Sequence, residues 1–226
     1  MNILYEDNHL FIINKAVGQI VQGDKTNDIS LIDEIKQYLK TKHNKPGNVF
    51  VGLPHRLDRP TSGVVIFTKT DKALTRFNEM FKQSEVKKLY WAVVNAQPPK
   101  NQDVLTHYLT RNAKQNKSYA YDTAIKESKI AVLEYKQIAK SDHYYLLEID
   151  LKTGRHHQIR CQLAKIGCYI KGDLKYGASR SNPNGGIHLH ARSAEFIHPV
   201  TKQLLTVTAP TPDDSLWNAF NAMLTS

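Results

Sequence analysis

Hydrophobic positions along the chain recur with two different periods. In three segments the apolar side chains return every three or four positions, as on one face of a helix, and these are residues 30–39, 71–83 and 156–166. Ser30 opens the first segment and Thr70 or Asp71 the second, and such residues commonly cap the start of a helix. Gly167 follows the third, where helices often end. We therefore predict three helices.

Short runs of β-branched and aromatic residues, bounded by polar or turn residues, are more frequent than the helical segments. They cover residues 10–14, 64–69, 89–95, 131–138 and 144–151. Strands and helices do not alternate regularly, so we predict an α+β fold with a mixed, largely antiparallel sheet. The Pro- and Gly-containing stretches at 95–102 and 179–186 are expected to be surface loops, which leaves residues 1–226 as a single domain.

The composition is that of a folded globular protein. Hydrophobic residues make up 41% and charged residues 23% of the 226, which excludes a disordered or collagenous chain. Two cysteines cannot form a disulfide framework, and no secretory signal is present, so a reducing, cytoplasmic location is expected. The longest apolar runs are far shorter than the ~20 residues of a membrane span. We expect no membrane association.

The chain carries a large excess of positive charge. Thirty-one Lys and Arg residues against 21 Asp and Glu give a net charge of +10, which favours a polyanionic partner such as nucleic acid. Between Lys152 and Arg180, seven basic residues accompany one acidic residue, so this stretch holds six (7 − 1) of the ten net charges. Such a run is either a solvated face or an anion-binding surface.

One motif places an aspartate between two arginines. Residues 55–63 read H-R-L-D-R-P-T-S-G and lie directly before an apolar strand. The charges of Arg56 and Arg59 favour the ionised form of Asp58, which makes it available as a nucleophile or an electrostatic partner. The alternative is a surface turn in which Asp58 and Thr61 form local backbone hydrogen bonds.

A second motif, T-G-R-H-H-Q-I-R at residues 153–160, joins a predicted strand to a predicted helix. Free backbone N–H groups at the helix start, with Arg155 and two histidines beside them, favour an anion such as phosphate. The alternative is simple capping by Thr153 with His156 and His157 exposed. A metal site is disfavoured, because adjacent histidines on a helix point about 100° apart and no further ligand has suitable spacing.

Two further patterns are weaker. His188, His190 and Arg192 alternate as in a strand, and a histidine pair of this spacing can bind zinc or copper. No third ligand is evident, so a packing or hydrogen-bonding role is expected. Tyr90 and Trp91 are neighbours in a predicted strand and face opposite sides, so one can enter the core while the other lines a cleft.

The order and wording of these motifs resemble the RluA-type RNA pseudouridine synthases. Residues 55–63 are similar to the family motif H-R-L-D-x-x-T-S-G. The resemblance continues through K-x-Y-x-A at 88–92, G-R-x-H-Q-I-R at 154–160 and G-D-x-x-Y-G at 172–177. It implies the pseudouridine synthase fold, a curved mixed sheet with a central cleft, and the isomerisation of uridine in ribosomal or transfer RNA. No cofactor or metal is implied, nor an additional N-terminal RNA-binding module.

The resemblance also implies roles for individual residues. Asp58 would help break the glycosidic bond, by attack at C1′ or removal of the 2′ proton. Arg155 would pair with Asp58 and orient it, and Tyr90 would abut the flipped uracil and help remove its C5 proton. Arg56 would fill the gap left by the base or hold a phosphate, and Ile159 would supply an apolar wall. From the basic stretch at 152–180, Arg160, Lys165 and Lys171 are expected to contact the substrate's phosphates.

Two other functions remain open at this point. The first is an RNA-binding protein on the same scaffold without catalysis. The second is a retaining glycosidase, which would require a second carboxylate paired with Asp58, and no motif nominates one. In every case the expected partner is RNA or another polyanion, with no obligate protein partner and a monomeric chain.

Overall fold

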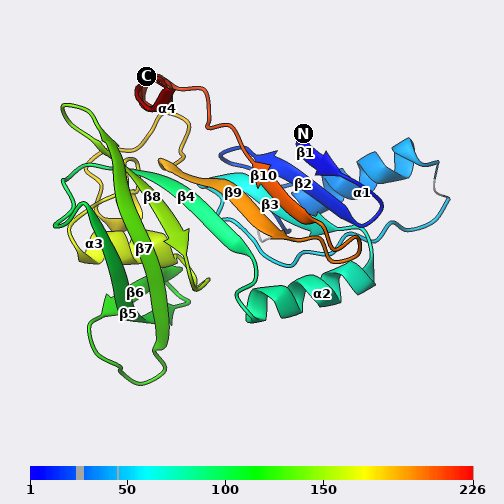
Figure 1. The fold of residues 1–226 in the computed structure, drawn as a ribbon, viewed down its shortest axis with the longest axis horizontal. Coiled ribbons are helices and arrows are strands. Elements are labelled where there is room, and N and C mark those ends of the chain that lie inside the picture. The colour runs from blue at the N-terminus through cyan, green and yellow to red at the C-terminus, as the bar shows by residue number, and fades with distance from the viewer. Residues whose placement is uncertain (24–27, 45, 226) are drawn as a thin grey trace.

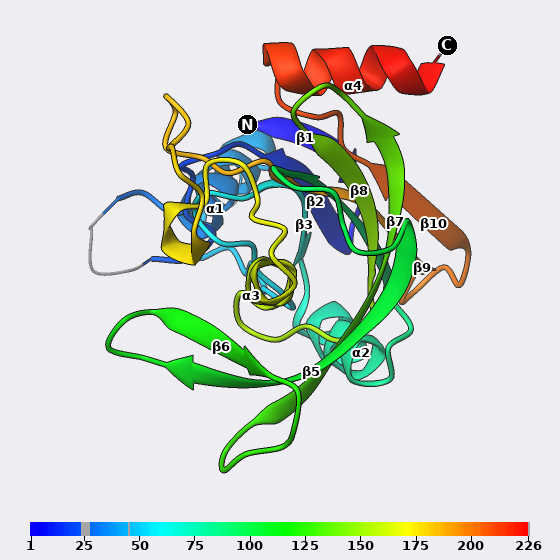
Figure 2. The ribbon, with the colours of Figure 1, turned by 90° about the vertical axis from the view of Figure 1, so that its left-hand side faces the viewer.

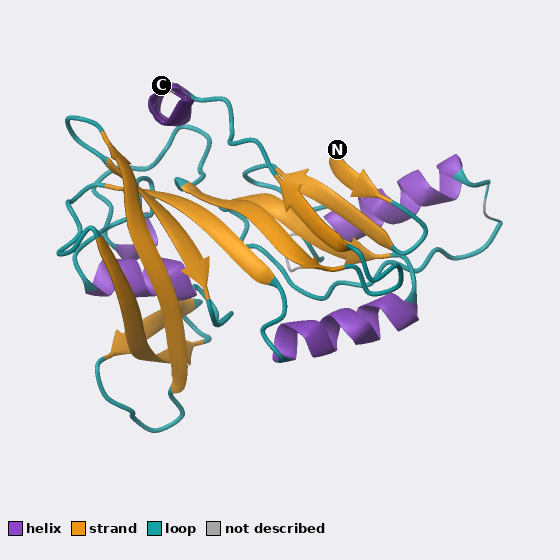
Figure 3. Cartoon of the chain, in the orientation of Figure 1, coloured by secondary structure: helices purple, strands orange, loops and turns teal. Residues whose placement is uncertain are grey.

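The computed structural model describes residues 1–23, 28–44 and 46–225. Within these ranges, ten strands form one sheet, accompanied by four α-helices and a short 3₁₀ turn, η1. Figure 1 and Figure 3 show the arrangement of the sheet and helices. In chain order the elements are β1 (Asn2–Glu6), β2 (Leu10–Lys15), α1 (Leu31–Lys42), β3 (Ser62–Thr68), α2 (Asp71–Lys82), β4 (Lys87–Val94), β5 (Gln102–Asn112), β6 (Lys117–Tyr121), β7 (Lys129–Lys140), β8 (Tyr145–Leu151), α3 (Gln158–Lys165), η1 (Leu174–Tyr176), β9 (Leu189–Ile197), β10 (Leu204–Thr208) and α4 (Ser215–Thr225).

The strands follow the order β1-β2-β3-β9-β4-β8-β7-β5-β6, and β10 pairs with β9. Among the described strands, β3 and β9 form the one parallel pair, and the others are antiparallel. The sheet curves strongly, so that β8, β7 and β5 bend around α3 (Figure 2). The predicted α+β class with a curved, largely antiparallel mixed sheet is therefore confirmed.

All three predicted helices are present. The Ser30 hydroxyl accepts from the backbone N–H of Asp33 at the start of α1, and the Thr70 hydroxyl caps α2 in the same way. Helix α3 begins at Gln158, two residues later than its hydrophobic pattern predicts, because His157 adopts a left-handed backbone conformation with φ of 52°. In the resulting arrangement, Arg160 of the second motif contacts Asp58 of the first motif, and Arg155 does not.

The five predicted strands correspond to β2, β3, β4, β7 and β8. Strands β1, β5, β6 and β10 and helix α4 were not predicted. In β5 exposed and buried side chains alternate, but the inward positions include His107, which is 7% exposed and accepts a hydrogen bond from Gln162. Because some inward positions of β5 are polar, the pattern of hydrophobic residues does not predict this strand.

The helices divide between the two faces of the sheet. Helices α1 and α3 pack on one face, in a cluster that includes Leu31, Tyr90 and Leu163. Helix α4 packs on the other, where Trp217 and Trp91 belong to one hydrophobic cluster. Tyr90 and Trp91 thus face opposite sides of β4, as their adjacency predicts. Within the described part of the chain, no helix is long and apolar enough to cross a membrane.

The parallel pair β3–β9 holds the strand that follows the first motif. Ser62 pairs with His190 and Gly63 with Ala191, and the Ser62 hydroxyl lies 2.9 Å from His190 Nδ1. Gly63 has a φ of 114°, and a Cβ there would lie 2.3 Å from the carbonyl oxygen of Ala191. A side chain at this position would push the two strands apart, so the motif requires glycine here.

A buried lysine fixes the loop that carries Asp58. Lys15 is fully buried at the end of β2, and its ammonium donates to the carbonyl oxygens of Ala16, Arg59 and Thr61 at 3.1, 3.1 and 2.6 Å. Burial lowers the pKa of Lys15 to about 7, and its amino group still meets three backbone acceptors. It is a strong anchor, because each carbonyl would otherwise be left without a partner.

We expect Lys15→Met to lower the free energy of unfolding by about 2 to 4 kcal/mol, because three acceptors lose their donor. Urea denaturation would measure this loss. Lys36 lies on the exposed side of α1, and Lys36→Met is the matched control that should change stability by less than about 0.5 kcal/mol. Equal losses in the two variants would contradict the anchoring role of Lys15.

Candidate active site

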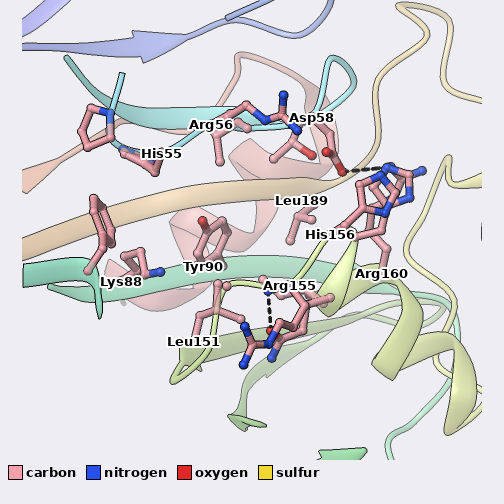
Figure 4. A pocket seen from close by; sticks show the side chains of 18 of the residues that line it. His55, Arg56, Asp58, Lys88, Tyr90, Leu151, Arg155, His156, Arg160 and Leu189 are labelled. Atoms are coloured by element: carbon pink, nitrogen blue, oxygen red, sulfur yellow. Dashed lines mark hydrogen bonds and ion pairs between the residues drawn. The ribbon is translucent and has the colours of Figure 1, made fainter. Parts of the chain in front are cut away.

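A cleft of about 530 Å³ lies between the Asp58 loop, the start of β4 and the segment that enters α3 (Figure 4). Both sequence motifs line it, although nearly a hundred residues separate them. Six of the residues named from the sequence lie along its walls, namely Arg56, Asp58, Tyr90, Arg155, Ile159 and Arg160. Lys165 and Lys171 do not line it.

Asp58 is held through one of its two carboxylate oxygens. Oδ2 accepts a hydrogen bond from Arg160 Nη1 at 3.0 Å and lies 3.3 Å from His157 Nε2. Among the described residues, none forms a hydrogen bond with Oδ1. The side chain is 31% exposed, so Oδ1 remains accessible to a molecule in the cleft.

Arg160 is itself fixed by a second aspartate. Its Nε and Nη2 donate to the two carboxylate oxygens of Asp173 at 2.7 and 2.8 Å, and both side chains are buried. A guanidinium bound through two parallel hydrogen bonds has a fixed plane, which leaves Nη1 directed at Asp58. The position of Asp58 therefore depends on Asp173.

His157 approaches Asp58 from the other side. The backbone N–H of Ser118 donates to the Tyr176 hydroxyl oxygen at 2.8 Å, and that hydroxyl lies 3.0 Å from His157 Nδ1. The phenol O–H is then the donor to Nδ1, which leaves the ring proton on Nε2, toward Asp58. Burial lowers the pKa of His157 to about 3 despite the opposing charge of Asp58, so the ring is neutral.

The G-D-x-x-Y-G segment supplies both supports. Asp173 and Tyr176 lie at the two ends of η1, one behind Arg160 and the other behind His157. Gly172 and Gly177 flank the turn with φ of 87° and 112°. The sequence resemblance includes this segment but gives it no role, and its proximity to Asp58 could not be predicted from spacing along the chain.

The predicted pairing of Arg155 with Asp58 is wrong in this structure. Arg155 lies in the irregular turn before α3, and its Nε donates to the backbone oxygen of Ile130 at 2.9 Å. Arg160 is on the first turn of α3 and takes the place expected for Arg155. The late helix start is the physical reason.

The alternative of simple helix capping is also not found. Thr153 Oγ1 donates to the side chain of Gln158 and accepts from the backbone N–H of Val132, so it does not cap α3. His157 is buried, and the ring of His156 stacks on it at a centroid distance of 3.8 Å. The stacked histidines and the side chain of Gln158, which accepts from Thr153 and from the backbone N–H of Arg155, hold this turn together.

Apolar and aromatic groups form the remaining wall of the cleft. Tyr90 is 8% exposed, and Ile159 and Leu189 line the cleft with it. Burial, with a further contribution from the charge of Asp58, raises the pKa of Tyr90, so its hydroxyl keeps its proton. Arg56 is exposed at the same cleft. A flat, uncharged ring could fit against Tyr90 within reach of Asp58.

The long basic stretch is not one continuous surface. Lys165 forms an ion pair with Asp122 at 2.8 Å, and Lys171 donates to Asn182 at 2.6 Å. Arg160 is buried beside its two aspartates. Contacts of Lys165 and Lys171 with RNA stay a prediction. Lys82 and Lys88 also line the cleft, and neither was predicted to bind the substrate, although Lys88 begins the K-x-Y-x-A motif.

His190 in β9 and His188 directly before it have hydrogen-bonding roles, as expected, and the amide of Asn182 donates to His188 Nδ1 at 3.0 Å. The Nε2 atom of His190 lies 3.1 Å from the carbonyl oxygen of Ala209, and its Nδ1 contacts Ser62. His188 lies 3.0 Å from Asp214 and stacks on Trp217. Among the described residues, no group of three or more potential ligands could hold a metal ion.

Comparisons with known proteins agree with this geometry. The sequence profile described as RNA pseudouridylate synthase matches residues 9–165. A ribosomal large subunit pseudouridine synthase D from Xylella fastidiosa is 32% identical over 231 residues, which cover 95% of this chain and 67% of that protein. The chain belongs to the RNA pseudouridylate synthase family. Enzymes of this family are isomerases that convert uridine in RNA into pseudouridine.

Other relatives are consistent with this membership. An uncharacterised RNA pseudouridine synthase of Synechocystis is 31% identical over 215 residues, which cover 94% of this chain and 66% of that protein. The chain thus spans about two thirds of the length of these curated relatives. The solved structure of human RNA pseudouridylate synthase domain containing 4 superposes with a TM-score of 0.79 at 23% identity, covering 99% of this chain and 93% of that one. That likeness establishes the fold.

Proposed function

We propose that this pseudouridine synthase isomerises uridine in structured RNA with Asp58 as the catalytic residue. The supporting observation is the asymmetric hold on Asp58, with Oδ2 fixed by Arg160 and Oδ1 accessible in the cleft. Breaking the glycosidic bond needs an ionised carboxylate beneath the ribose, either for attack at C1′ or for removal of the 2′ proton. The guanidinium of Arg160 stabilises that charge.

Tyr90 fits the role of a support for the uracil ring. The target nucleotide must leave its stack to reach the cleft, which costs a few kcal/mol in duplex RNA. A protonated, buried phenol offers an aromatic surface and a hydrogen-bond donor, and its raised pKa makes it a poor base at neutral pH. The exposure of Arg56 at the cleft supports a role in binding a phosphate or filling the gap left by the base.

The two alternative functions find less support. A retaining glycosidase needs a second carboxylate at the cleft, and Asp58 is the one carboxylate that lines it among the described residues. Asp173 is nearby, but it is 1% exposed and both of its oxygens bind Arg160. An RNA-binding protein without catalysis would have no need for so firmly positioned an aspartate.

Pseudouridine formation on purified RNA tests the proposal. We favour ribosomal RNA as substrate, because relatives in several bacteria are named as ribosomal large subunit enzymes. Unmodified ribosomal and transfer RNA transcripts would be incubated with the protein, and pseudouridine would be mapped by sequencing. Mapping in cells with and without the gene would identify the position. The absence of pseudouridine from both RNA classes and both kinds of experiment would refute the activity.

Tyr176→Phe tests whether His157 acts on Asp58. The substitution removes the hydroxyl that fixes the His157 ring, so we expect the single-turnover rate at saturating RNA to fall about tenfold while RNA affinity stays constant. Tyr119 is the matched control, because it is exposed on β6 and its hydroxyl binds only Gln115 among the described residues. If Tyr176→Phe matched Tyr119→Phe in rate, His157 would be a packing residue.

A further inference from the structure

A second cleft continues from the first. It has a volume of about 710 Å³ and runs between the end of α2, the start of β4 and the end of β8. The two clefts share Phe81, Lys82, Lys88, Leu151, Gly154 and Arg155. A molecule in the active-site cleft can therefore extend directly into the second one.

The second cleft is strongly basic. Five cationic side chains line it against one carboxylate, Asp150. That carboxylate is already bound by the ammonium of Lys152. We call this surface the lysine groove, and it consists of Lys82, Lys87, Lys88, Lys152 and Arg155. A row of cations beside an active site attracts a polyanionic strand.

Lys88 lies where the two clefts meet, and its ammonium has no bonded partner. No hydrogen bond or ion pair holds it among the described residues, and its nearest recorded contact is the Phe81 ring, 5.2 Å away. Burial lowers the pKa of Lys88, although the charge of Asp150 opposes this. Lys15, which is buried, and Lys171, which is partly buried, differ in that both donate hydrogen bonds.

The groups around Lys88 leave its charge uncompensated. His55 lies in the same cleft, but burial lowers its pKa to about 3, and its Nε2 accepts from the backbone N–H of Ile66. Gly154 covers the ammonium without a side chain, and a Cβ there would lie 3.7 Å from Lys88 Nζ. A partly buried cation with open space and no counter-ion is suited to an anionic ligand.

We propose that Lys88 binds a backbone phosphate next to the target uridine, and that the adjoining strand follows the lysine groove. This inference rests on the proposed function for the identity of the strand as RNA. A phosphate at the junction would hold the nucleotide's backbone while its base enters the cleft toward Tyr90 and Asp58. The negative charge of the phosphate would favour the protonated form of Lys88.

Binding of a short fluorescein-labelled oligouridylate, followed by anisotropy over a series of salt concentrations, tests this site. We expect Lys88→Ala to weaken binding about tenfold and to reduce the slope of log affinity against log salt by about 0.7, the value for one single-strand phosphate contact. Lys88→Arg should retain most of the slope. Lys140→Ala removes an exposed lysine that lines neither cleft and should bind like the unmodified protein.

A second measurement uses the unmodified protein and does not depend on a variant folding. Lysines are acetylated with and without the oligouridylate and the products are analysed by mass spectrometry. Bound RNA should protect Lys88 several-fold more than Lys140. Unchanged affinity and slope in Lys88→Ala, or equal acetylation with and without RNA, would overturn the site. If the protein forms no pseudouridine yet both results hold, the lysine groove stands and the proposed function fails.

Discussion

Asp58→Asn should reduce the single-turnover rate of pseudouridine formation by about a thousandfold or more, with RNA affinity and Tm near those of the unmodified protein. Asparagine keeps the shape of the side chain and an oxygen that can accept from Arg160. It lacks the negative charge that attack on C1′ or removal of the 2′ proton requires. Rates would be measured at saturating RNA, and affinity by anisotropy on the same transcript.

Asp142→Asn is a suitable control, because Asp142 is exposed in the turn before β8, outside the cleft. It should leave rate, affinity and Tm unchanged. Mass spectrometry of the Asp58→Asn protein is needed to exclude reversion to aspartate by deamidation. A verified variant that retained a tenth of the original rate would remove Asp58 from the catalytic role.

Arg160→Lys and Arg155→Lys form a matched pair within one motif. Arg160 joins Asp58 to Asp173 through three nitrogens, and a lysine has no planar fork with which to bridge two carboxylates. We expect Arg160→Lys to lower the single-turnover rate by about two to three orders of magnitude, through misalignment of Asp58. Arg155 binds a backbone oxygen at the cleft wall, so Arg155→Lys should change the rate less than about threefold.

The two arginine variants also differ in expected stability. Lysine at position 160 leaves part of the buried Asp173 carboxylate without a donor, which should cost about 3 kcal/mol of unfolding free energy. Arg155→Lys should have no measurable effect on urea denaturation. If the Arg155 variant proved slower than the Arg160 variant, Arg155 would have to move onto Asp58 when RNA binds.

The sequence predicts the class of fold and the catalytic loop because both are encoded locally. Residues 55–63 form one contiguous motif, and the strands with strongly apolar runs are recognisable by composition. The partner of Asp58 is not encoded in this way. It depends on the backbone at His157, where a left-handed conformation delays the helix and brings Arg160 into reach. Hydrophobic periodicity gives no information about a single φ angle.

The supports behind the site are less predictable still. Asp173 and Tyr176 reach Asp58 only through other side chains, so their roles depend on tertiary packing. The charge density along the chain favours Lys165 and Lys171, but neither lines the cleft, and they contact Asp122 and Asn182 instead. Lys82 and Lys88, which do line the cleft, lie at the end of α2 and the start of β4, where the sequence has no comparable excess of positive charge.

The parallel pairing of β3 with β9 has a consequence for how the chain folds. Ser62 and His190 are 128 residues apart in sequence, yet they meet directly beside the loop that carries Asp58. Closing so long a loop costs conformational entropy before the new contacts stabilise the structure, so pairings of this kind form late in folding. The hairpins β1–β2 and β7–β8 can form from neighbouring residues alone. Catalytic competence should thus be among the last properties that the refolding chain acquires.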